Sequence, residues 1–167
     1  MHSAIPCPRT PGSGFTLIET MIVMVVIGLA LAAGAPFFQG YMQSRGIEAS
    51  MNVLVSQIDL ARNRALAENN PYRVLLNSPD DAQYVVHDDD NANGSIEDGE
   101  TVYGPFRLSG TVAFQTIELG GGDVIVFEVS GMLPAGQGGR ITLADAGGRF
   151  QTLEVYTSGV TAPAEDP

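Results

Sequence analysis

The feature that most constrains this chain is one long apolar segment close to its N-terminus. Residues 15–38 read FTLIETMIVMVVIGLALAAGAPFF, and Glu19 is the only charged residue among these 24 positions. A helix of about 20 apolar residues crosses the ~30 Å hydrocarbon core of a bilayer. The segment is longer than the apolar region of a secretory signal, and its small residues, Gly12-Ser13-Gly14, come before it rather than after it. We therefore expect residues 15–38 to form a retained transmembrane helix.

The order of the N-terminal segments also indicates how the chain is processed and oriented. A short polar stretch, residues 1–14, precedes the apolar segment, which favours a leader that is removed on the cytoplasmic side. The rest of the chain then crosses the membrane once. A globular domain, residues 39–160, is expected on the outer side, and residues 161–167 are expected to form a flexible tail.

The apolar pattern changes after the membrane segment. Apolar residues recur at every third or fourth position, which predicts an amphipathic continuation of the helix. The helix is expected to end near Glu68, because Pro71 lacks a backbone donor and biases Asn70 out of the helical region. The stripe expected to face the domain core consists of Ile47, Met51, Leu54, Ile58, Ala61 and Ala65.

Short apolar or alternating runs, separated by turn clusters, follow the helix. Such runs predict strands, and the short turns between them favour antiparallel pairing. One long helix packed on antiparallel sheet gives an α+β domain. The expected strands are Tyr72–Leu76, Gln83–His87, Thr101–Leu108, Thr111–Glu118, Val124–Val129, Arg140–Leu143 and Phe150–Thr157.

The composition excludes several classes of function. All eight basic residues are Arg, against 19 Asp and Glu, and the net charge of −11 disfavours binding to nucleic acid. Cys7 is the only cysteine, which excludes a disulfide framework. His2 and His87 are the only histidines, too few for a zinc cluster. The glycine runs lack the Lys-Ser/Thr of a phosphate-binding loop, and no nucleophile motif lies near His87, so we expect no enzymatic activity.

The start of the apolar segment resembles a known processing site. Gly14-Phe15-Thr16-Leu17-Ile18-Glu19 is similar to the cleavage site of type IV pilins and type II secretion pseudopilins. In that family a prepilin peptidase cuts after the glycine and methylates the new N-terminal residue. The resemblance therefore implies cleavage between Gly14 and Phe15 and N-methylation of Phe15. It also places Gly28 and Pro36 where family members carry a helix glycine and a helix-kinking proline.

The resemblance further implies a location and an assembly role. The helix is expected in the inner membrane, with the domain in the periplasm and other pilins or pseudopilins as filament partners. A carboxylate within such a helix costs about 2.5–3.5 kcal/mol on insertion scales, and it is usually functional. By resemblance, Glu19 pairs with the free α-amine of Phe15 in the neighbouring subunit. The alternative, which we favour less, is that Glu19 merely reaches the lipid headgroups.

Two later motifs point to a subgroup of the family. The helix end Asp59-Leu60-Ala61-Arg62-Asn63-Arg64-Ala65 and the strand end Phe127-Glu128-Val129-Ser130-Gly131 resemble the H-like minor pseudopilins and the FimT minor pilins. The leading expectation is a minor pseudopilin of a type II secretion system, located near the pseudopilus tip, where it promotes export of folded exoproteins. The first alternative is a FimT-like minor pilin that primes type IV pilus assembly. FimT-like DNA binders carry Arg after the last strand, and residues 157–161 have none, which disfavours DNA uptake.

A second alternative comes from an acidic loop. Residues 80–100 hold eight acids and no Lys or Arg, and Asp89 to Glu100 fit the calcium-loop pattern D-x-[DN]-x-[DN]-G-x₅-E. Ca²⁺ prefers six to eight oxygen ligands, and the glycine allows the sharp turn. By this template the ligands are side-chain oxygens of Asp89, Asn91, Asn93 and Glu100, the backbone carbonyl of Ser95, and Glu97 through water.

The interpretation favoured for this loop is nevertheless a solvated hairpin. The flanking runs look like strands rather than the helices of an EF-hand, and two template positions are neutral Asn. Asp and Asn side chains in such hairpins hydrogen-bond their own backbone turns. His87, at the end of the preceding strand, is expected to be a structural or surface residue. A membrane-anchored calcium-binding or enzymatic domain would keep its leader, and it would not need Glu19.

Overall fold

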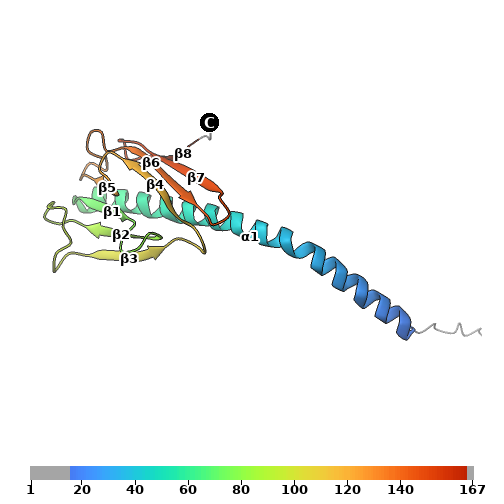
Figure 1. Cartoon of the computed structure of the whole chain (residues 1–167). Coiled ribbons are helices and arrows are strands. Elements are labelled where there is room, and N and C mark those ends of the chain that lie inside the picture. Colours follow the sequence, from blue (N-terminus) through green and yellow to red (C-terminus); the bar gives the residue numbers. More distant parts are fainter. Residues whose placement is uncertain (1–15, 165–167) are drawn as a thin grey trace, which may run out of the picture. The chain divides into compact units, whose positions relative to one another are not determined.

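The computed structural model describes residues 16–164, apart from the side chains of residues 34–44. One helix, α1 (Leu17–Glu68), contains 52 residues and precedes all the strands (Figure 1). The chain divides into two compact units, residues 1–39 and 40–167. The helix contributes its first part to the first unit and its second part to the second, which also contains both sheets.

Local sequence explains both ends of α1. At the start, Thr16 Oγ1 accepts a hydrogen bond from the backbone N–H of Glu19 at 3.3 Å, in the Thr-x-x-Glu arrangement of a capping box. At the end, Asn69 adopts a positive φ of 54°, a conformation that Asn tolerates better than most residues. Asn70 N–H then bonds to Ala65 O at 3.3 Å, and Pro71 follows. The predicted helix end near Glu68 is confirmed.

In the described residues, 16–164, eight strands form two four-stranded antiparallel sheets. The first sheet has the order β3-β2-β1-β5, and the second has the order β4-β6-β7-β8. The first sheet comprises β1 (Tyr72–Leu76), β2 (Gln83–Asp88), β3 (Val102–Arg107) and β5 (Val124–Phe127). The second comprises β4 (Ala113–Leu119), β6 (Gly139–Ala144), β7 (Phe150–Val155) and β8 (Thr161–Pro163). The expected α+β fold, one long helix with antiparallel sheets, is confirmed.

One hydrophobic core joins the second part of α1 to both sheets. In Figure 1 the later, green part of the helix runs beside the strands. Leu54 and Ile58 from the helix are fully buried, together with Val74 of the first sheet and Ile141 of the second. All six residues of the predicted stripe are buried, at 5% exposure or less: Ile47, Met51, Leu54, Ile58, Ala61 and Ala65.

The end of the chain differs from the expectation. Residues 161–163 form β8, which pairs with β7 through Val155 and Thr161, whereas we expected residues 161–167 to be a flexible tail. The turn at Gly159, with a φ of 79°, reverses the chain and lets Tyr156 N–H bond to Val160 O at 2.9 Å. This correction applies to residues 161–163, and residues 165–167 lie outside the described residues.

The structure does not test the predicted membrane segment as a whole. Within residues 16–164, no helix is both long enough and apolar enough to cross a bilayer. The segment 15–38 includes Phe15 and the side chains of residues 34–38, which lie outside the described residues. The helix continues through position 36, but the Pro36 side chain is among those not described. The membrane span and the kink at Pro36 therefore stay predictions.

Candidate functional site

The first candidate site is the N-terminal part of α1. Residues 16–33 are all exposed, although most of them are apolar. Leu17 is 79% exposed and Met24 is 73% exposed. At Gly28 an added Cβ atom would meet nothing within 4 Å. A surface of this kind on a chain by itself indicates a site that lipid or other proteins cover.

Glu19 lies on this surface, in the first turn of α1. Its backbone N–H bonds to Thr16 Oγ1, and Thr20 Oγ1 donates to Leu17 O at 2.8 Å. An acidic residue in the first turn also suits the positive end of the helix dipole. Glu19 therefore stands at a position that serves helix initiation, and its assembly contact stays a prediction. Gly14 and Phe15, the predicted cleavage residues, lie outside the described residues.

The second candidate site is the loop between β2 and β3, at residues 89–101. His87, at the end of β2, is fully buried, and its Nε2 lies 2.8 Å from Glu100 Oε2. Because an ionised carboxylate only accepts hydrogen bonds, Nε2–H is the donor. The expectation of a structural His87 is confirmed and the surface alternative is wrong. His87 Nδ1 and Glu100 Oε1 are both buried without a hydrogen-bond partner.

Asp89 anchors the beginning of this loop. Its side chain is fully buried and forms an ion pair with Arg73 of β1. It also accepts hydrogen bonds from the backbone N–H groups of Asn93, at 3.1 Å, and Gly94, at 3.1 Å. Gly94 has a φ of 80°, and a Cβ atom there would approach the Arg73 guanidinium at 3.1 Å. A glycine is therefore favoured at the turn that closes on Asp89.

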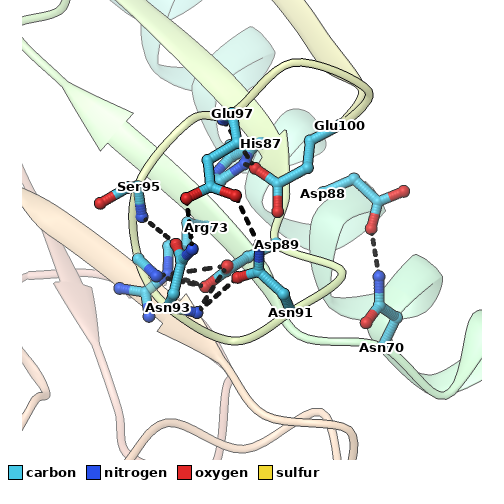
Figure 2. Close-up of polar contacts among 11 residues, drawn as sticks. Asn70, Arg73, His87, Asp88, Asp89, Asn91, Asn93, Ser95, Glu97 and Glu100 are labelled. Carbon is cyan, nitrogen blue, oxygen red and sulfur yellow. Dashed lines mark hydrogen bonds and ion pairs between the residues drawn. The ribbon is translucent and has the colours of Figure 1, made fainter.

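The exposed rim of the loop is held by Glu97. Asn91 Nδ2 donates to Glu97 Oε2 at 3.2 Å, and Asn93 Nδ2 donates to Glu97 Oε1 at 2.9 Å. Asn93 Oδ1 accepts the backbone N–H of Ser95 at 2.7 Å. Figure 2 shows Glu97 close to Asn91 and Asn93, with Glu100 beside His87. The structure thus brings together all six residues of the predicted loop site.

Hydrogen bonding keeps both buried carboxyl groups acidic. Burial raises the pKa of Asp89, but the bonds from Arg73 and the Gly94 N–H outweigh this effect, and the pKa lies below the ordinary 3.8. The bonds from His87 and the Glu97 N–H lower the pKa of Glu100 below the ordinary 4.5. Both groups therefore carry negative charge at neutral pH.

The sequence did not identify two members of this cluster, Arg73 and His87. One ligand atom from each of His87, Asp89 and Glu100 lies within 4.8 Å of the others. The feature that places Arg73 beside this cluster is the antiparallel register of β1 and β2, in which Arg73 is the partner of His87. This pairing could be recognised only once the strand order was known. Within residues 16–164, these three residues form the only such group of potential metal ligands.

The basic side chains of the described residues are already engaged. Arg62 donates to Gly131 O at 3.0 Å, and the Arg64 guanidinium lies 3.8 Å from the Tyr103 ring centroid. The carboxylate partners of the others are Asp89 for Arg73, Asp80 for Arg107, Glu154 for Arg140 and Asp145 for Arg149. Arg45 also has an interaction. This arrangement offers no cluster of arginines for a phosphate backbone.

Two family models match the chain. The model described as type II transport protein GspH matches residues 50–159, and the prokaryotic N-terminal methylation motif matches residues 12–35. Together they cover both candidate sites. A comparison with curated proteins gave no match.

Two solved structures share the fold. Both are crystal structures of the type IV minor pilin FimU from Pseudomonas aeruginosa, in space groups P21 and P65. The first has a TM-score of 0.53 and 10% identity, covering 75% of this chain and 92% of FimU. The second has a TM-score of 0.50 and 11% identity, covering 71% and 92%. These likenesses concern the fold alone.

Proposed function

The chain belongs to the GspH family of type II transport proteins, and from that premise we propose that it is a minor pseudopilin of a type II secretion system. Families of this kind are structural, and their members assemble with other pilin-like subunits after processing by a prepilin peptidase. In the proposal, the protein is anchored in the inner membrane by one helix and carries its domain in the periplasm. It assembles near the pseudopilus tip and promotes export of folded exoproteins.

The observation that carries this proposal is the unpartnered apolar surface at residues 16–33. Ile22 is 58% exposed and Val25 is 61% exposed, whereas Leu54 and Ile58 of the same helix are fully buried by the sheets. A helix that is apolar on every side belongs inside a membrane or a bundle of similar helices. A filament whose core consists of N-terminal helices supplies such surroundings, and the membrane supplies them before assembly.

Charge supports a protein partner over nucleic acid. The whole chain has a net charge of −11, and loss of the leader with Arg9 makes it one unit more negative. Nucleic-acid affinity comes mainly from Lys and Arg at phosphates, and the described arginines contact groups of the chain itself. The functional surfaces proposed here are for assembly and contact, with no catalytic role.

The experiment that tests this proposal is a clean deletion of the gene, assayed in parallel for exoprotein secretion and for pilus-dependent motility and transformation. We expect secretion to fall and motility to be retained, with rescue by the wild-type gene in trans. Loss of motility or transformation with normal secretion would contradict the proposal. That result would favour the second candidate, a FimT-like minor pilin that primes pilus assembly, because the chain shares its fold with a type IV minor pilin.

Two matched variants test whether the secretion defect arises from failed assembly. Glu19→Gln removes the charge but keeps a side chain that is compatible with the capping box. Glu48→Gln makes the same change on an exposed position of the second part of α1. We expect Glu19→Gln to fail in complementation and Glu48→Gln to succeed.

A further inference from the structure

The 89–101 loop contains a buried carboxylate oxygen that its own hydrogen bonds leave unsatisfied. The Glu100 side chain is 6% exposed. Its Oε2 accepts bonds from His87 Nε2 at 2.8 Å and from the Glu97 N–H at 3.0 Å, but its Oε1 is buried without a partner. Asp89, whose side chain is fully buried, has an oxygen within 4.8 Å of a Glu100 oxygen. A buried, charged oxygen without a donor is costly unless a cation meets it.

The charges around Glu100 point to a missing positive partner. Arg73 pairs with Asp89. Glu97 accepts bonds from two side-chain amides, and Glu100 accepts them from an imidazole and a backbone N–H. Asp89, Glu97 and Glu100 thus place three carboxylates in one hydrogen-bonded loop, and one guanidinium, that of Arg73, pairs with the first of them. The excess of negative charge is of the size that one divalent cation neutralises.

The donor atoms indicate which cation fits. Carboxylate and amide oxygens predominate, and they come from loop positions 1, 3, 5, 9 and 12, the spacing at which calcium loops supply their ligands. We propose that the loop binds one calcium ion, held by Asp89 and Glu100 and closed by oxygens of Glu97, Asn91 and Asn93. Each Asn Oδ1 accepts one backbone hydrogen bond and keeps a second lone pair for a ligand bond.

His87 has a positioning role in this proposal. Its hydrogen bond holds Glu100 Oε2 and thereby leaves Oε1 free to face the ion. The alternative is that His87 is itself a ligand, because one imidazole with two carboxylates is a donor set that suits zinc. We favour calcium because oxygen-bearing side chains in the loop outnumber the one imidazole nitrogen that lacks a hydrogen-bond partner, His87 Nδ1. The bound ion would tie the end of β2 to the start of β3.

The primary experiment is calcium titration of the full chain in detergent, followed by calorimetry and by thermal unfolding. Two of the template ligands are neutral, so we expect a Kd on the order of 10⁻⁴–10⁻³ M, as in weak extracellular calcium modules. At 10 mM CaCl₂ the unfolding temperature of the domain should rise by roughly 3–10 °C relative to an EGTA-treated sample. No rise in the wild-type chain would overturn the proposal and leave Arg73 as the only cation at the loop.

Single substitutions test which carboxylates bind the calcium ion. Glu97 is exposed, so Glu97→Gln should fold normally and weaken calcium binding by about tenfold or more, in line with the dependence of affinity on ligand charge. Glu100→Gln should have an effect at least as large. Glu118→Gln, the same change at an exposed position of β4, should bind like the wild type. Equal binding by all three variants would contradict the proposal.

Zinc titration distinguishes the two cations. With calcium as the ion and His87 in a positioning role, His87→Gln should bind calcium more weakly than the wild type but better than Glu100→Gln. Zinc binding that is tighter than calcium binding, and that His87→Gln abolishes, would show that the site takes zinc and would refute the calcium proposal. This inference is independent of the proposed secretion function, because the two experiments share no readout.

Discussion

The two parts of α1 are both rich in apolar residues, yet they have opposite environments within the chain. Residues 16–33 are exposed without exception, and Leu17 reaches 79%. Later in the helix, Leu54 and Ile58 are completely buried while Val53, beside them in sequence, is 50% exposed. Apolar content alone says that a helix needs covering. The spacing of the apolar residues determines which kind of covering fits. A stripe on one face packs against the two sheets, whereas an all-round apolar surface fits surrounding lipid or helices.

The largest effect is expected at Glu19, and it should appear in assembly rather than stability. Replacement by Gln removes a charge that costs about 2.5–3.5 kcal/mol to place in a membrane and that an assembly contact would neutralise. We expect incorporation into pseudopili to fall on the order of tenfold or more, measured by recovery of the protein with sheared or purified pseudopili. Urea unfolding of the domain should be unchanged. A normal level of incorporation would break the proposed distinction between the two parts.

The next effect concerns the buried stripe. Leu54→Ala should destabilise the domain by about 2–5 kcal/mol, because it removes fully buried methyl groups and leaves a cavity. Ile22→Ala, in the first part of the helix, should leave the domain's free energy of unfolding unchanged. Urea unfolding in detergent, followed by the near-ultraviolet signal of the buried Tyr72 and Tyr84, measures both variants. Similar losses in the two variants would contradict the proposed difference in environment.

A smaller effect is expected from two hydroxyl groups on the same helix. Ser50 Oγ is buried and accepts the backbone N–H of Ser109 at 2.9 Å, so Ser50→Ala should cost about 1–3 kcal/mol. Thr20 Oγ1 donates to Leu17 O within the exposed first turn, and Thr20→Ala should not change the stability of the domain. The same unfolding assay applies. If Ser50→Ala has no effect, the packing of α1 on the loop after β3 is weaker than described.

The smallest effect is a pH dependence confined to the domain. Burial raises the pKa of Asp145, but hydrogen bonds from the Arg149 N–H and guanidinium outweigh it, and the pKa lies below 3.8. A lowered pKa in the folded state gives stability that is present above pH 3.8 and is lost as pH falls through the folded value. Asp145→Asn should reduce the acid sensitivity of urea unfolding between about pH 4 and pH 2. If Asp145→Asn leaves the acid sensitivity of unfolding unchanged, this origin of the pH dependence is excluded.

Much of the fold was predictable because its signals are local. The stripe from Ile47 to Ala65 follows helix period, and Asn-Pro stops the helix where expected. Seven of the eight strands lie where alternating apolar residues and glycine turns placed them. Strand β8 was missed because Thr161–Pro163 is short and ends in Pro, and its pairing depends on the turn at Gly159.

The candidate loop site was only half predictable for a related reason. The template residues from Asp89 to Glu100 lie close in sequence, and their spacing matched a calcium loop, although the interpretation favoured from the sequence was a solvated hairpin. Arg73 reaches Asp89 from another strand, and burial of His87 depends on packing between elements. Such contacts depend on strand order and register, which local patterns do not specify. The same limit applies to the partner of residues 16–33, because that partner lies outside the chain.

The most direct test of the proposed assembly is photo-crosslinking in cells, with a crosslinking amino acid at Val25 and, as a control, at Val53. Both positions are exposed, on the first and second parts of α1. We predict crosslinks from position 25 to other pilin-like subunits, and their loss in Glu19→Gln. If position 25 gives no crosslinks to such subunits, or if Glu19→Gln leaves its crosslinks unchanged, assembly through the N-terminal part of the helix is contradicted.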